Sequence, residues 1–113
     1  MPAANATQLT VRMYDFILWI TARAASFPRA YSFILGNRLL DTAYVCHNQL
    51  VHARKVGGVE RIRAQLDADV TLEALRTQLL TAQELHCIDL RQYAHGAGLL
   101  NEIGKMLGSW RTG

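Results

Sequence analysis

The stretch QLTVRMYDFILWITARAASFP, residues 8–28, decides the fold. One apolar stripe recurs in it at spacings of three and four residues, the period of a helix: Leu9, Met13, Phe16, Ile20 and Ala24. A second apolar stripe lies beside the first: Val11, Tyr14, Leu18, Ala22 and Ala25. The pattern predicts a helix over residues 8–26 that is apolar on more than one face. It should end before Pro28, because proline disfavours helical geometry in the residue ahead of it.

Three further helices are predicted after this one. Pro28 suits the first turn of a helix over residues 28–56, where its missing N–H is no loss. Its expected inward face consists of Leu35, Leu39, Thr42, Cys46, Leu50 and Ala53. Gly57-Gly58 should stop it. The next helix is predicted over residues 59–86, bent or broken near residues 67–71, with this inward face: Ile62, Leu66, Leu72, Leu75 and Leu79.

The fourth helix has a clear start signal. Asp89 is a favourable N-cap residue, and Gln92 stands three positions later, as a capping box requires. Four long helices with short connections favour an antiparallel up-down-up-down four-helix bundle, an all-α fold. Because the apolar stripes exceed what a lone bundle can cover, we also expect an oligomer.

The chain has 113 residues, enough for one domain, which we place at residues 8–113 after a disordered segment at residues 1–7. The longest apolar run, residues 16–20, is too short to span a membrane. No secretory signal is visible in MPAANATQLT, and two cysteines make no disulfide scaffold. We therefore expect a cytoplasmic protein with no membrane partner.

Positive charge is concentrated in the first half of the chain. Residues 1–63 hold eight basic residues against three acidic ones, whereas residues 64–113 hold four against six. Ten of the twelve cations are arginine, whose planar fork suits phosphate. This distribution indicates an anionic partner, RNA or DNA before membrane, or else an ordinary soluble surface.

No pattern of catalytic or metal-binding residues emerges. Zinc would need four converging ligands, but the only soft-ligand clusters are Cys46-His47, His52 and His86-Cys87. Carboxylates are scattered, and no serine has the context of a nucleophile. We expect no catalytic residue, no metal and no cofactor.

Glycines in the last helix suggest close packing, because each costs about 1 kcal/mol against alanine in a helix interior. Gly104 and Gly108 should form a flat strip for helix contact, and Gly36 in the second helix invites the same explanation. Arg38 and Glu102 lie beside apolar stripes, so we expect a cross-helix ion pair between them.

Three stretches read together resemble a known family: LWITARAASFPRAYSFILGNRLLDT (residues 18–42), LEALRTQLLTAQELHCIDLRQY (72–93) and LLNEIGKMLGSW (99–110). They resemble the accessory variability protein (Avd) of diversity-generating retroelements, and the wider four-helix-bundle group that includes the rRNA intervening-sequence proteins. The likeness runs from about Tyr14 to Trp110. Residues given structural roles with it are Pro28, Gly36, Arg38, Glu102, Gly104, Gly108 and Trp110.

The resemblance implies a ring-like homopentamer and a protein that is not an enzyme. It implies partners too: the reverse transcriptase of the retroelement and its template RNA or DNA, in mutagenic retrohoming. The expected binding surface consists of Arg12, Arg23, Arg29, Arg54, Lys55, Arg61 and Arg63. The alternative is a structural oligomer of the rRNA intervening-sequence type with no polymerase partner.

Overall fold

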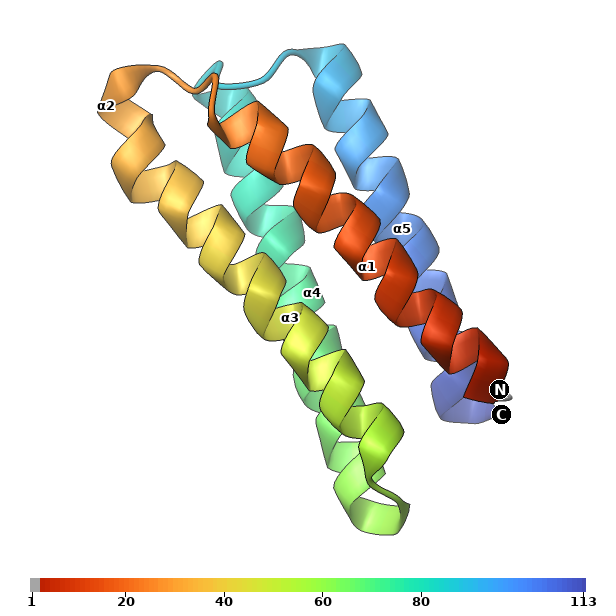
Figure 1. Cartoon of the computed structure of the whole chain (residues 1–113). Coiled ribbons are helices and arrows are strands. Elements are labelled where there is room, and N and C mark those ends of the chain that lie inside the picture. The colour runs from red at the N-terminus through yellow and green to blue at the C-terminus, as the bar shows by residue number, and fades with distance from the viewer. Residues whose placement is uncertain (1–2) are drawn as a thin grey trace.

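The protein is a bundle of four long helices (Figure 1). The computed structural model describes the backbone of residues 3–113 and the side chains of residues 6–113. The long helices are α1 (Ala3–Ala24), α3 (Asn37–Lys55), α4 (Gly58–Glu84) and α5 (Leu90–Thr112). A short helix, α2 (Arg29–Tyr31), and a π-helical turn, η1 (Ser32–Gly36), connect α1 to α3. Residues 3–113 contain no strand, which confirms the predicted all-α class.

Helices that follow one another along the chain pack as antiparallel neighbours, and α1 also packs against α5. The main contacts therefore run around the bundle in the order α1, α3, α4, α5, with α1 diagonally opposite α4 and α3 diagonally opposite α5. Both chain termini and the α3–α4 turn lie at one end, while α2 and the α4–α5 connection lie at the other (Figure 1). This is the predicted up-down-up-down arrangement.

The core follows the first predicted stripe of α1. Its five members are all buried: Leu9, Met13, Phe16, Ile20 and Ala24. The second stripe faces outward instead, with Val11, Tyr14 and Leu18 about half exposed. In a single bundle, each helix packs against the other helices only through its inner side. The second stripe of α1 is therefore not covered by any other helix of the same chain.

Helix α1 begins at Ala3, earlier than residue 8, where the apolar pattern predicted its start. Residues 3–7 are helical, so the expected disordered segment at residues 1–7 is wrong for these five positions, while Met1 and Pro2 lie outside the described residues. Alanine has the highest helix propensity of any residue, and three of these five positions are alanine. Ala6 is also buried in the core, so this turn is held by packing as well.

The predicted second helix is interrupted near its start. The five-residue π-helical turn η1 separates α2 from α3, and such a turn inserts an extra residue into the helical register. Leu35 and Gly36 consequently face the core, while Phe33 and Ile34 point to solvent. From Leu39 onward the predicted face is buried at Leu39, Cys46, Leu50 and Ala53, as expected.

Helix α4 is continuous from Gly58 to Glu84, so the predicted alternative of a break near residues 67–71 is wrong. It ends at Glu84 because His86 takes a φ of 62°, and the Cys87 N–H then donates to the Ala82 carbonyl at 2.8 Å. The His86 N–H also donates to the Gln83 carbonyl, at 3.0 Å, and the two hydrogen bonds together form a Schellman motif. At the start of α5 the predicted capping box is confirmed: the Gln92 N–H donates to Asp89 Oδ1 at 2.7 Å, and the Asp89 N–H donates to Gln92 Oε1 at 3.0 Å.

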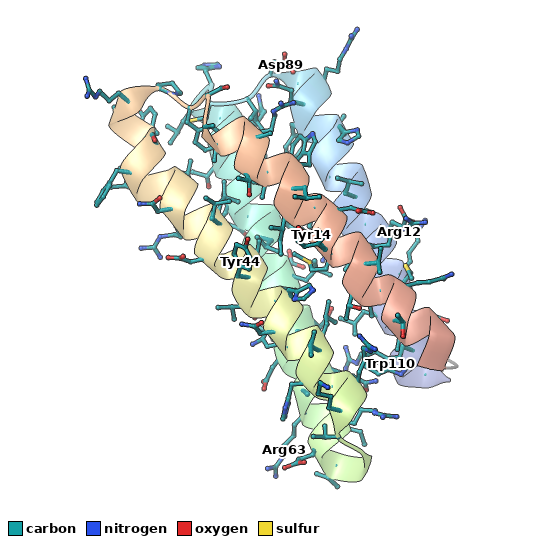
Figure 2. The ribbon with its side chains drawn as sticks, viewed as in Figure 1. Arg12, Tyr14, Tyr44, Arg63, Asp89 and Trp110 are labelled. Carbon is teal, nitrogen blue, oxygen red and sulfur yellow. The ribbon has the colours of Figure 1, made fainter. Side chains whose placement is uncertain are left out.

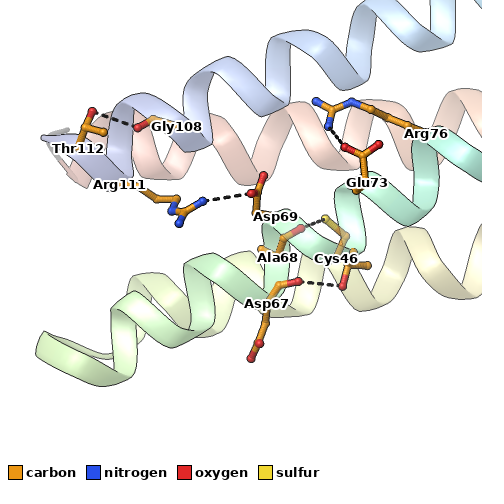
Figure 3. Close-up of polar contacts among 10 residues, drawn as sticks. Cys46, Asp67, Ala68, Asp69, Glu73, Arg76, Gly108, Arg111 and Thr112 are labelled. Atoms are coloured by element: carbon orange, nitrogen blue, oxygen red, sulfur yellow. Dashed lines mark hydrogen bonds and ion pairs between the residues drawn. The ribbon is translucent and has the colours of Figure 1, made fainter.

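The inward face of α4 differs from the prediction in its first half. Leu72, Leu75 and Leu79 are buried as expected, but Ile62 and Leu66 are 63% and 48% exposed. The buried positions there include Ala64 and Ala68, which permit close approach to α3. The Cys46 thiol lies against α4, with its sulfur 3.8 Å from the carbonyl oxygen of Ala68 (Figure 3).

The glycines of α5 meet different surroundings. A Cβ at Gly104 would stand against the guanidinium of Arg76, whereas one at Gly108 would meet nothing within 4 Å. The helix contact expected at Gly108 is therefore not made within one chain. A Cβ at Gly36 would have ordinary van der Waals neighbours, the nearest at 3.6 Å. At Gly96 the neighbour is a ring rather than the end of a flexible side chain, and a Cβ there would be 2.7 Å from the Trp19 ring.

Alanine substitutions two positions apart in α5 should have opposite effects on stability. Gly96→Ala requires the Trp19 ring to move, and overpacking costs about 1–3 kcal/mol, more than the gain of about 1 kcal/mol in helix propensity. Gly98→Ala meets open space, so it should stabilise the protein by up to about 1 kcal/mol. Urea unfolding of the two variants at equal protein concentration measures the difference. Shifts of the same sign and size would contradict this account of Gly96.

Candidate nucleic-acid interface

Four of the predicted binding cations flank the connection between α3 and α4: Arg54, Lys55, Arg61 and Arg63. We call this set the basic turn. The turn itself is formed by Gly57 and Gly58. Gly58 has a φ of +58°, a backbone conformation that residues other than glycine rarely adopt. This confirms the predicted stop at Gly57-Gly58. Figure 2 places Arg63 at the end of the bundle beside this turn.

Two of these four cations hold the fold together. Arg61 Nε donates to the Ala53 carbonyl at 2.9 Å, and Arg61 Nη2 lies 3.4 Å from the Arg54 carbonyl, so the side chain satisfies carbonyls at the end of α3. Its guanidinium also sits over the ring of Trp110, 5.7 Å from the ring centroid. Arg54 Nη1 donates to Thr10 Oγ1 at 3.2 Å, which links α3 to α1.

Lys55 and Arg63 are the cations of the basic turn that stay uncommitted. Both are exposed, and within residues 6–113 neither side chain has a hydrogen bond or an ion pair. Uncommitted cations of this kind can exchange their counterions for phosphate groups, which is the main source of sequence-independent nucleic-acid affinity. Lys55 and Arg63 are therefore the two cations of the basic turn whose charged groups have no partner within the described side chains.

The remaining predicted cations lie elsewhere on the bundle. Arg12 pairs with Glu102 at 3.0 Å and with Asp15 at 3.5 Å, so its charge is offset locally. Arg23 lies over the Trp19 ring at 6.0 Å from the centroid. Arg29 is exposed at the opposite end of the bundle from the basic turn. The structure thus does not gather the seven predicted cations into one surface.

The expected ion pair between Arg38 and Glu102 is absent. Glu102 bonds to Arg12 instead, because α5 packs beside α1, whereas α3, which carries Arg38, is diagonal to α5. Arg38 stays exposed near η1. Of the other structural residues, Trp110 is buried beneath Arg61, and Pro28 directly precedes α2, where its carbonyl accepts the N–H of Tyr31 at 2.9 Å.

Burial raises the pKa of both thiols, Cys46 and Cys87. Burial, with a smaller effect of Asp69, raises the pKa of Cys46 to about 12, so the thiol stays protonated. Burial and the nearby Arg54 lower the pKa of His47. Asp69 itself pairs with Arg111 at 3.1 Å (Figure 3). Among residues 6–113, no three His, Cys, Asp or Glu side chains converge as a metal site would require.

Two exposed apolar surfaces remain on the bundle: one contains the second stripe predicted for α1, and the other contains Ile62 and Leu66, which were predicted to face inward. The α1/α3 face consists of Val11, Tyr14, Leu18 and Tyr44, and Figure 2 shows Tyr14 and Tyr44 on the same side of the bundle. The α4 stripe consists of Val59, Ile62, Leu66 and Val70, spaced three and four residues apart. The available signal was the surplus of apolar positions in both helices.

A comparison with protein families matches this architecture. The family model described as bAvd-like covers residues 8–112, nearly the whole chain. The chain belongs to the bAvd-like family. The members of this family are generally accessory, non-catalytic proteins. No curated protein and no solved structure matches this bAvd-like chain.

No helix of this bAvd-like bundle, over residues 3–113, is both long enough and apolar enough to cross a membrane.

Proposed function

We propose that the chain is a non-enzymatic, cytoplasmic accessory protein of a diversity-generating retroelement, which binds the reverse transcriptase and its template RNA or cDNA and so supports mutagenic retrohoming. The family match over residues 8–112 carries this proposal. The uncommitted cations Lys55 and Arg63 support the nucleic-acid part of it, because neither forms an ion pair with a carboxylate in the described chain.

We further propose that the working form is a ring-like homopentamer. A ring requires a head-to-tail contact in which each copy uses two different surfaces. The α1/α3 face and the α4 stripe are two such surfaces, and α1 and α4 lie diagonally across the bundle. Five copies would carry a formal charge of about +15, from +3 per chain, which favours salt-sensitive binding of phosphates.

The test is size-exclusion chromatography with light scattering at low and high salt, with absorbance read at 260 and 280 nm. Five chains of 12.6 kDa give about 63 kDa, and bound RNA should be shed as salt rises. When the purified reverse transcriptase is added, the enzyme should elute in the same peak as the accessory protein. The same mass with neither RNA nor polymerase bound would favour the structural oligomer of the intervening-sequence type instead.

Substitution within the α4 stripe should separate assembly from folding. Leu66→Asp puts a charge on an exposed position, so the helix content should stay unchanged while the mass falls toward one chain. Leu90→Asp, at a position that is 70% exposed outside both surfaces, is the matched control and should keep the mass of the wild type. A Leu66→Asp protein that still elutes as a pentamer would place the contact elsewhere.

A further inference from the structure

The end of the bundle opposite the basic turn carries a third exposed apolar surface. Phe33 and Ile34 of η1 are 77% and 63% exposed, and Leu85 at the end of α4 is partly exposed near Ile34. We call the set Phe33, Ile34, Arg38 and Leu85 the η1 corner. A π-helical turn is rare and often marks a functional site, and here it is what turns Phe33 and Ile34 outward.

Two adjoining grooves give the η1 corner its shape. The first, of about 270 Å³, runs between η1 and α4 and is lined by Ile34, Leu85 and Tyr31 among others. The second, of about 540 Å³, lies along the start of α3 beside Phe33. Ile34 and Arg38 line both grooves. Arg38 therefore lines one groove together with Leu85 and the other together with Phe33, and Asn37, Asp41 and Thr42 make the larger groove partly polar.

Arg38 has no carboxylate partner, unlike three other arginines of the bundle. Arg12, Arg76 and Arg111 each pair with an acidic side chain at 3.0–3.5 Å. The guanidinium of Arg38 has no ion pair or hydrogen bond within residues 6–113. A planar fork beside the exposed apolar side chains of Phe33 and Ile34 is suited to a bidentate contact with a carboxylate that arrives with apolar neighbours.

From these observations we infer that the η1 corner is the surface that binds the reverse transcriptase, through an amphipathic segment of that enzyme with apolar anchors and a carboxylate for Arg38. The inference rests on the proposed function. RNA fits the corner less well, because Arg38 is the one cation among the residues that line the two grooves and Asp41 adds a negative charge to the larger groove. The corner also shares no residue with the α1/α3 face or the α4 stripe. Template and polymerase would thus meet opposite ends of the bundle (Figure 1).

The test measures the affinity of the full-length protein for the purified reverse transcriptase by titration calorimetry. The double variant Phe33→Ser/Ile34→Ser and the single variant Arg38→Glu should each bind about 30-fold more weakly or worse, the loss typical of a central anchor. Arg38→Lys should fall between Arg38→Glu and the wild type, because it keeps the charge but loses the fork. Leu90→Ser removes an apolar side chain of similar exposure outside both grooves and is the control.

Each other outcome rejects a specific claim. A wild-type chain that does not bind the polymerase overturns the proposed function and this inference with it. A wild type that binds, with corner variants within twofold of it, overturns the inference alone. Corner variants that lose template RNA but keep the polymerase make the corner an RNA site, and a changed oligomeric mass makes it a contact between copies. Either result overturns the inference. Circular dichroism of each variant verifies that the helices are intact.

Discussion

Replacing Lys55 and Arg63 together by glutamate is expected to weaken template-RNA binding about 30-fold or more at 0.15 M salt, with the unfolding midpoint unchanged. The loss follows from counterion release, since each phosphate contact with a single strand contributes a slope of about 0.7 in the logarithm of affinity against the logarithm of salt concentration. Two lost contacts amount to about 15-fold at this salt concentration, and the repulsion added by charge reversal brings the loss to about 30-fold or more. Stability should not change, because neither side chain has a partner in the described chain.

Filter binding or fluorescence anisotropy at several salt concentrations measures both the affinity and its salt slope, which should become shallower by about 1.4. The matched control is Arg91→Glu/Lys105→Glu, which changes the charge equally at exposed positions of α5. If control and test variants lose affinity equally, total charge rather than the basic turn governs binding. If neither loses affinity, the basic turn does not contact RNA.

Truncating Phe16 to alanine should destabilise the protein by about 3–5 kcal/mol, the range for a large aromatic side chain removed from a core. Phe16 is fully buried in α1, and its ring lies 6.0 Å from that of Trp19, centroid to centroid. The lost contacts and the cavity left behind both contribute to the loss of free energy. Urea unfolding at a fixed protein concentration measures it.

Phe33→Ala makes the same chemical change at an exposed position and is the control. Because Phe33 is 77% exposed, its truncation should change the free energy of unfolding by less than about 0.5 kcal/mol. The two variants therefore separate burial from residue type. A loss below 1 kcal/mol for Phe16→Ala would mean that this part of the core is looser than the structure describes.

Local signals made much of the fold predictable from the sequence. The period of Leu9, Met13, Phe16 and Ile20 identified the buried side of α1, and Gly57-Gly58 located the α3–α4 turn. The Asp89 capping box located the start of α5. These features depend on neighbours a few residues apart, so sequence reasoning reaches them.

Features set by packing between helices were not predictable in the same way. Ile62 and Leu66 compete with Ala64 and Ala68 for the inside of α4, and the alanines are buried because α3 comes close there. Arg12 rather than Arg38 meets Glu102 because of the order of helices around the bundle.

The same limit applies to the candidate binding surface. The sequence identified the cations of the basic turn, but it could not distinguish Lys55 and Arg63 from Arg54 and Arg61, whose partners lie on other segments of the bundle. Their roles follow from the assembled bundle.

The position of Arg61 has a consequence for the entropy of binding. Through its contacts with α3 carbonyls and the Trp110 ring, this α4 residue ties together three helices on either side of a two-residue turn. The backbone that carries Lys55 and Arg63 is thereby immobilised when the chain folds. A ligand arriving at these cations has only two side chains left to order, so less conformational freedom is lost on association than at a flexible basic loop.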